Sequence, residues 1–229
     1  MWYFIIFALE FKNRKFMRIF FKLMAVALIL MTAFVACDKD NPNEPNNPSN
    51  PTDSLNDVGV KINGVTWATR NVDKPGTFAA KPEVPGMFYQ WNRPIGWSAT
   101  DPIVNSNDGT NWDNSMPAGY SWETNVCPSG WRIPTRSELQ NLIYSGSSWS
   151  TLNGVNGYFF GNGNQKVFFP AAGSRSIGGT LICEGDVGYY WSSTRNGNDD
   201  AYILDFDHNI AEMRSYFRGY GLSIRCVKE

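Results

Sequence analysis

Few side chains in this chain could carry acid–base or nucleophilic chemistry. His208 is the only histidine, and its Asp-His-Asn-Ile setting is typical of a turn between two strands. Serine is frequent, but no nucleophile-elbow pattern is present and no second histidine could complete a relay. We therefore do not expect the protein to be an enzyme.

Tryptophans are better suited to ligand contact, because an indole face can stack on a sugar ring or anchor a protein partner. Four of them stand in polar, irregular surroundings: Trp97, Trp112, Trp122 and Trp149. Four others stand in strand-like contexts and are expected in the core: Trp67, Trp91, Trp131 and Trp191. The alternative for the first four is that each holds its loop against the core.

The charge balance excludes one class of partner. The chain has a formal net charge of −1, and residues 58–229 carry no excess of either sign. Nucleic-acid binding needs an excess of Lys and Arg to pair with phosphates, so we exclude it. All 21 glycines lie at or beyond Gly59, which indicates a turn-rich domain of short strands.

Residues 1–36 are predicted to be a secretory signal peptide. A basic start at Met17 precedes an apolar run that is short for a transmembrane helix. We expect Met17 to be the true initiator. Phe34-Val35-Ala36-Cys37 resembles the lipobox of bacterial lipoproteins, which makes Cys37 the predicted lipidation site. The acidic residues after it resemble the surface-export signal of Bacteroidota lipoproteins.

Residues 37–57 are predicted to be an acidic tether. Prolines recur there every third residue, which matches the polyproline II repeat. Plain disorder suits the same composition equally well. We expect the protein to meet the membrane through the lipid anchor alone, at the outer membrane and exposed on the cell surface.

Residues 58–229 predict one α+β domain. Asn63-Gly64 marks a β-hairpin, and Thr135 with Glu138 forms a capping box before a helix that Gly146 ends. Further strands are expected over 87–91, 166–170, 188–193, 201–207 and 222–227. Residues 92–125 lose all periodicity, which indicates either a long functional loop or elements that periodicity fails to assign.

The cysteines imply one structural bridge. Acylation of Cys37 leaves three cysteines, and an oxidising compartment favours one disulfide among them. The residues alone leave three pairings open: 127 with 183, 127 with 226, or 183 with 226.

Several sequence blocks together resemble the Fibrobacter succinogenes major paralogous domain. They are Gly64-Val-Thr-Trp67-Ala-Thr-Arg-Asn71, Phe88-Tyr-Gln-Trp91, Asn125-Val-Cys127-Pro-Ser-Gly-Trp131-Arg-Ile-Pro134-Thr135, Phe169-Pro-Ala-Ala-Gly173, Tyr190-Trp191-Ser-Ser-Thr194 and Gly221-Leu-Ser-Ile-Arg225-Cys226-Val227. They span nearly all of residues 58–229. The resemblance implies a C-type-lectin-like fold on a bacterial surface protein. It also implies that Cys127 pairs with Cys226 and that Cys183 is left over.

The resemblance raises two chemical alternatives. Formylglycine-generating enzymes share the C-type-lectin-like fold, but they use a cysteine pair near the C-terminal end, where this chain has Cys226 alone. Many C-type lectins bind sugar through calcium, and Asn107-Asp108 and Asn198-Asp199-Asp200 supply suitable oxygens. Their characteristic ligand triplets are missing here, so these residues are read as polar turns, and no metal or other cofactor is expected.

C-type-lectin-like domains generally recognise ligands with segments just before the last strand. This implies a ligand face on the segment from Arg195 to Tyr220, together with the loop around Trp112. The residues predicted to bind are Trp112, Asp199, Asp200, Arg214, Tyr216 and Arg218. Related domains are diversified at such positions in some bacteria. The competing interpretation is that these side chains only solvate a sheet edge.

The first functional hypothesis is therefore a surface-anchored lipoprotein that binds an extracellular glycan or protein. The second is a structural role, in which the domain is a fimbrial-tip or assembly component that docks a neighbouring subunit. A third and weaker alternative is an enzyme of the formylglycine-generating type.

Overall fold

The structure is a computed structural model, and it describes residues 57–229. The predicted signal peptide, the lipidation site Cys37 and the tether up to residue 56 lie outside the described residues. Nothing in the structure therefore tests them.

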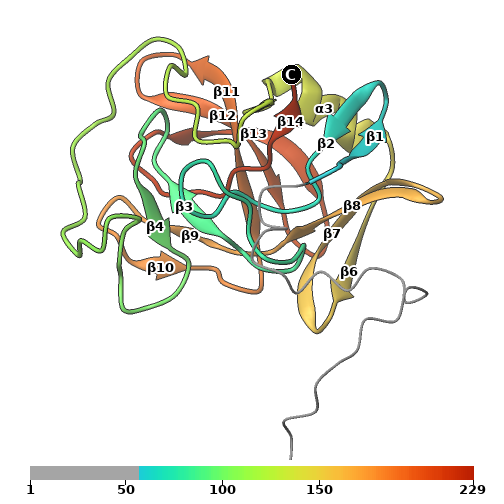
Figure 1. The fold of residues 1–229 in the computed structure, drawn as a ribbon, viewed down its shortest axis with the longest axis horizontal. Helices are drawn as coiled ribbons and strands as arrows, with labels where there is room; N and C mark the ends of the chain where they lie inside the picture. Colours follow the sequence, from blue (N-terminus) through green and yellow to red (C-terminus); the bar gives the residue numbers. More distant parts are fainter. Residues whose placement is uncertain (1–56) are drawn as a thin grey trace, which may run out of the picture. The chain divides into compact units, whose positions relative to one another are not determined.

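The described residues form short strands and one α-helix, α3 (Arg136–Tyr144). The strands are β1 (Val60–Ile62), β2 (Val65–Trp67), β3 (Met87–Tyr89), β4 (Gly96–Ser98), β5 (Trp131–Arg132), β6 (Ser147–Leu152), β7 (Val155–Asn162), β8 (Gln165–Pro170), β9 (Ser174–Arg175), β10 (Leu181–Ile182), β11 (Gly188–Asn196), β12 (Asp200–Phe206), β13 (Ala211–Phe217) and β14 (Val227–Lys228). They pair antiparallel in small sheets ordered β1-β2-β14-β5, β3-β4, β6-β7-β8, β9-β10 and β11-β12-β13 (Figure 1). The α+β prediction is confirmed.

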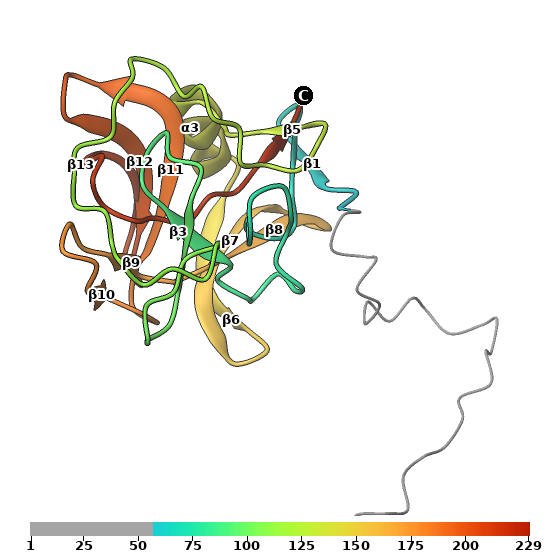
Figure 2. The same ribbon diagram turned by 60° about the vertical axis from the view of Figure 1, so that its left-hand side comes forward.

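The sheet β11-β12-β13 separates two parts of the hydrophobic core. Side chains alternate between the faces of a strand, so Trp191 and its partner Ile203 join one cluster, while Tyr190 and its partner Leu204 join the other. Leu139 of α3 belongs to the second cluster. Figures 1 and 2 show α3 packed close to this sheet.

Local signals explain where several elements begin and end. Asn63 and Gly64 adopt positive φ values of 48° and 86° in the turn between β1 and β2, as predicted. The Oγ1 of Thr135 accepts a hydrogen bond from the backbone N–H of Glu138, and the carboxylate of Glu138 accepts one from the N–H of Thr135. This is the predicted capping box of α3.

The hairpin of β6 and β7 was not predicted from the sequence. Asn153 and Gly154 form its turn, with φ values of 49° and 83°. The same Asn-Gly signal marks the first hairpin, so this turn could have been predicted from the sequence. The strand β6 was missed because it is mostly polar and exposed and so lacks the alternation of a half-buried strand.

The prediction of a last strand over 222–227 is wrong, because the last strand is Val227–Lys228. The backbone before it bonds to separate segments rather than along one neighbour. Leu222 exchanges hydrogen bonds with Tyr89, and the carbonyl oxygen of Ile224 accepts one from the N–H of Val72. The segment therefore joins several elements instead of extending a ladder.

Arg225 is the centre of a buried network that connects the family-like sequence blocks. Its guanidinium donates to Oδ1 of Asn71 at 2.7 and 2.9 Å and to the carbonyl oxygen of Ala68 at 3.0 Å. It also lies 4.3 Å from the ring centroid of Phe169. Asn71 in turn donates to the hydroxyl of Tyr190, which donates to the carbonyl oxygen of Pro170. These blocks therefore build the scaffold.

A disulfide joins Cys127 to Cys226, with Cα atoms 6.1 Å apart, and Cys183 is free and exposed. This is the pairing that the family resemblance implies. The bridge fastens the segment before β5 to the segment before β14, and both cysteines are buried.

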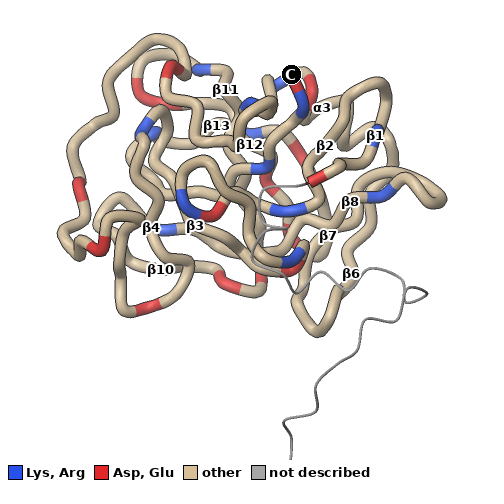
Figure 3. The backbone as a smooth tube through the Cα atoms, in the orientation of Figure 1, with Lys and Arg blue, Asp and Glu red and all other residues tan. Residues whose placement is uncertain are grey.

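Residues 92–125 were predicted to lack regular structure, which is corrected at β4, because Gly96–Ser98 pairs with β3; the rest of the stretch forms no helix or strand. In Figures 1 and 2 most of this stretch is the long green-to-yellow trace that leaves β4. Side chains hold it in place. The amide oxygen of Asn92 accepts hydrogen bonds from the N–H groups of Glu123 and Thr124, and Arg93 pairs with Asp113. Basic and acidic residues are interspersed over the domain (Figure 3).

Candidate functional site

Arg218, one of the residues predicted to bind a ligand, does not face solvent. It is 4% exposed, and its guanidinium donates to the carbonyl oxygens of Gly119 at 2.9 Å and Asn198 at 2.7 Å. It also lies 5.0 Å from the ring centroid of Trp91. These contacts fasten the long loop and the β11–β12 turn to the core, which is a structural role.

Trp112 is partly buried and is held from several sides. Its Nε1 donates to the carbonyl oxygen of Ile177 at 2.8 Å, and its ring centroid lies 4.9 Å from that of Trp97. A Cβ added to Gly221 would approach this indole to 2.9 Å, so the glycine permits the close packing. The contacts favour the alternative that Trp112 pins its loop. Trp97 is buried at 2% exposure and is therefore a core residue.

Asp199 and Asp200 lie at the turn between β11 and β12. Asp199 is exposed, and its carbonyl oxygen accepts a hydrogen bond from the N–H of Arg218. Asp200 begins β12 opposite Phe217. Residues 57–229 contain no group of three or more His, Cys, Asp or Glu side chains placed to hold a metal ion.

Tyr216 belongs to a cluster of three partly exposed tyrosines that we call the tyrosine surface: Tyr189, Tyr216 and Tyr220. The rings of Tyr189 and Tyr216 are stacked, with centroids 5.4 Å apart and planes at 28°. Tyr220 meets Tyr216 edge to face at 4.7 Å. Tyr220 ends the segment predicted as the ligand face but was not among the residues predicted to bind, and Tyr189 lies outside that segment. Their proximity to Tyr216 depends on the sheet and on the return of the chain after β13.

Arg214, also predicted, lies beside the tyrosine surface in a charged group. Its Nε is 3.3 Å from Oδ2 of Asp205, and its guanidinium also donates to Glu212. The register places Tyr189, Asp205 and Glu212 side by side across the sheet, so they share one face. Burial raises the pKa of Asp205 above its ordinary value, against the effect of Arg214.

The hydroxyls of Tyr189 and Tyr216 stay protonated near neutral pH. Burial raises the pKa of Tyr189, and the nearby Asp205 and Cys183 add to the rise. Burial likewise raises the pKa of Tyr216. The surface therefore offers neutral aromatic rings, hydroxyl groups, two carboxylates and one guanidinium. This combination can stack on a ring and form hydrogen bonds at its edge.

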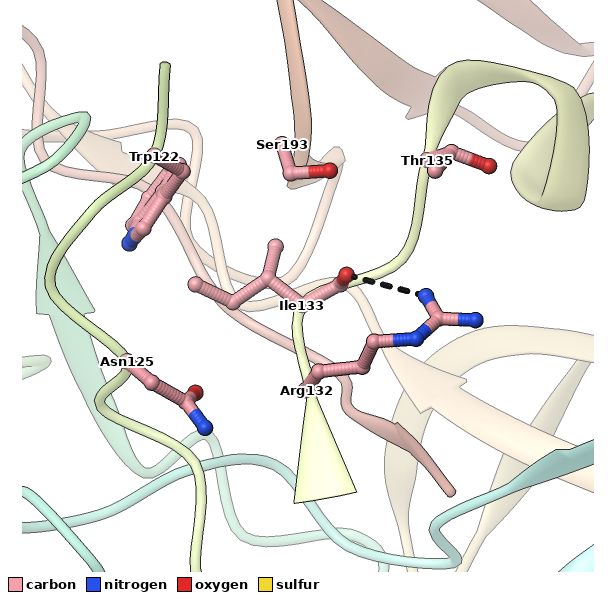
Figure 4. A pocket seen from close by; sticks show the side chains of 6 residues that line it. All are labelled: Trp122, Asn125, Arg132, Ile133, Thr135 and Ser193. Atoms are coloured by element: carbon pink, nitrogen blue, oxygen red, sulfur yellow. Dashed lines mark hydrogen bonds between the residues drawn. The ribbon is translucent and has the colours of Figure 1, made fainter. Parts of the chain in front are cut away.

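A separate pocket of about 310 Å³ lies between the long loop, β5, the start of α3 and β11. Its lining residues are Trp122, Asn125, Arg132, Ile133, Thr135 and Ser193. Figure 4 shows Trp122 and Asn125 on one side, Ile133 in the middle, and Arg132 and Thr135 on the other side. The sequence singled out Trp122 as a candidate aromatic face but did not associate it with the other five.

No helix among residues 57–229 has the length and apolar character to cross a membrane. Taken together, these observations define a small disulfide-bonded α+β domain with aromatic and polar groups on its surface.

The chain belongs to the Fibrobacter succinogenes major domain family, whose family model matches residues 60–228. Searches of the curated proteins and of the solved structures gave no match. The family assignment is compatible with a surface protein.

Proposed function

We propose that this protein is a surface-anchored lipoprotein whose domain recognises an extracellular glycan. In this proposal Cys37 carries the lipid, residues 38–57 hold the domain away from the outer membrane, and the domain has the C-type-lectin-like fold that the family resemblance implies. Recognition involves no catalysis.

The observation that supports the proposal best is the tyrosine surface. Its rings are partly exposed and fixed by mutual stacking, so little side-chain entropy would be lost on binding. Aromatic faces stack on the apolar face of a sugar ring, while Arg214 and Glu212 can bond to its hydroxyl groups. Arg214 and Tyr216 are the members of the predicted ligand set that carry this site.

The test is a glycan array probed with the full-length chain, with calcium and with a chelator. Tyr216→Ala should weaken binding to any recognised glycan about tenfold, as expected for one lost aromatic contact. Tyr144→Ala is the matched control, because this tyrosine is 74% exposed and lies on α3. Unchanged affinity in Tyr216→Ala would move the ligand site elsewhere.

Arg218→Ala separates recognition from scaffolding. Because Arg218 is buried and holds two backbone carbonyls, its loss should lower the melting temperature. Tyr216→Ala should change the melting temperature much less. Loss of binding in Tyr216→Ala at an unchanged melting temperature supports the site.

A structural role in assembly is the second candidate, favoured by one observation. Tyr120, in the long loop, is 83% exposed, and the guanidinium of Arg195 lies 4.4 Å from its ring centroid. Exposed aromatic and arginine side chains are typical protein anchors. This candidate predicts a stable complex with a protein encoded nearby, and Tyr120→Ala should weaken that complex. It also predicts that the glycan array gives no signal.

A further inference from the structure

The pocket beside Trp122 shares no lining residue with the tyrosine surface. Its volume of about 310 Å³ is at the lower end for ligand pockets and suits one small ring rather than a chain. Apolar atoms come from the side chain of Ile133 and from the indole of Trp122 (Figure 4). Trp91 supports that indole from outside the pocket, with ring centroids 5.3 Å apart.

The polar side chains of the pocket are held by bonds within the protein. Asn125 donates to the carbonyl oxygen of Trp131 at 2.7 Å and accepts from the N–H of Cys127 at 3.1 Å. Thr135 is engaged in the capping box with Glu138. The pocket is therefore preorganised, and a ligand would not have to fix these side chains.

The pocket has no net charge to offer. Arg132 donates two hydrogen bonds to the carboxylate of Glu138, at 2.6 and 2.9 Å, which neutralise both groups. Although burial opposes it, these bonds and those from Thr135 hold the pKa of Glu138 below its ordinary value. The carboxylate is therefore ionised at neutral pH and remains paired with the guanidinium.

Some hydrogen-bonding capacity remains at the rim. The Oγ of Ser193 donates only a long bond of 3.3 Å, to the carbonyl oxygen of Pro134, and its lone pairs can accept. A guanidinium has five N–H groups, of which Arg132 uses two on Glu138 and one, at 3.4 Å, on the carbonyl oxygen of Ile133 (Figure 4). A hydroxyl group placed here could donate to Ser193 and accept from Arg132.

From these features we propose that the pocket is a second binding site, which takes a single neutral pyranose ring. An apolar sugar face would lie against Trp122 and Ile133, and its hydroxyl groups would meet Ser193 and Arg132. A charged sugar would bring an ion into a site whose own charges are already paired, so it should bind more weakly.

The test is ligand-observed NMR with the full-length chain in a sugar-free detergent. The probes are the methyl pyranosides of glucose, galactose, mannose and N-acetylglucosamine, with methyl glucuronide as the charged comparison. At least one neutral glycoside should show saturable binding, seen as magnetisation transferred from the protein to the glycoside. Trp122→Ala should weaken it about tenfold and Ser193→Ala about fivefold, as expected for one aromatic contact and one hydrogen bond. Tyr144→Ala should leave it unchanged.

The proposal is overturned if no neutral glycoside binds, if methyl glucuronide binds as well as the best of them, or if both pocket variants bind like the unmodified chain. Should Trp122→Ala lower the melting temperature, the Ser193→Ala result decides alone, because that change removes only one hydroxyl group. A negative glycan array for the tyrosine surface does not affect this outcome, since that surface does not line the pocket.

Discussion

Replacing Arg225 with Met should cost the domain a large part of its stability. The guanidinium is fully buried and supplies three hydrogen bonds to two acceptors, Oδ1 of Asn71 and the carbonyl oxygen of Ala68. Each acceptor left buried without a donor costs about 1–3 kcal/mol. Loss of the contact with Phe169 adds about 1–2 kcal/mol. Because Met restores some apolar packing, we expect a net loss of about 4 kcal/mol.

The assay is urea unfolding of the full-length chain followed by tryptophan fluorescence, with linear extrapolation to water. Arg136→Met is the matched control, because this exposed arginine lies over the ring of Tyr202 at 4.2 Å and should cost less than about 1 kcal/mol. Asn71→Ala should cost less in the Arg225→Met background than alone, since the two residues share their bonds. A loss below about 1 kcal/mol for Arg225→Met would refute the network as a source of stability.

Three further outcomes are expected. Replacing Cys127 and Cys226 with Ser should lower the free energy of unfolding by up to about 4.7 kcal/mol, since the bridge spans 99 residues; an unchanged urea midpoint would contradict this. Glu138→Gln should destabilise by about 1 kcal/mol at pH 7. Hydrogen bonds from Arg132 and Thr135 hold the folded pKa of Glu138 below its ordinary value, so this difference should shrink as the pH falls through the folded pKa, and a difference independent of pH between 7 and 3 would contradict the capping role. Cys37→Ser should abolish labelling by a fatty-acid analogue and release the protein from membranes, and persistent labelling would refute the lipid anchor.

Local signals in the sequence were enough to predict the elements that depend on local chemistry. The Asn63-Gly64 turn needs two residues at positive φ, and the capping box needs Thr135 and Glu138 three residues apart, so both are encoded within a few positions. The segment 222–227 was misread as a strand because its alternation is real, but its backbone partners lie on several distant segments. Periodicity describes burial and does not specify a hydrogen-bond partner.

The ligand set was harder to predict, because exposure depends on how distant segments meet. Arg214 and Arg218 are four residues apart in the same polar and aromatic segment. Arg218 is nevertheless 4% exposed, whereas the side chain of Arg214 is 57% exposed. What separates them is the long loop, whose carbonyl at Gly119 reaches Arg218 from 99 residues away. No local pattern encodes that contact.

Burial separates the residues that build the scaffold from those of the two proposed binding sites. Arg225, Asn71 and Tyr190 come from the blocks that carry the family resemblance, and all three are buried in one hydrogen-bonded network. The side chains of these three residues cannot touch a ligand, so they serve the fold. The same blocks also supply five of the six residues that line the pocket beside Trp122: Asn125, Arg132, Ile133, Thr135 and Ser193. Both proposed binding sites use residues outside that network, such as Tyr216 and Trp122, which pack on the core with one side and leave part of the ring exposed.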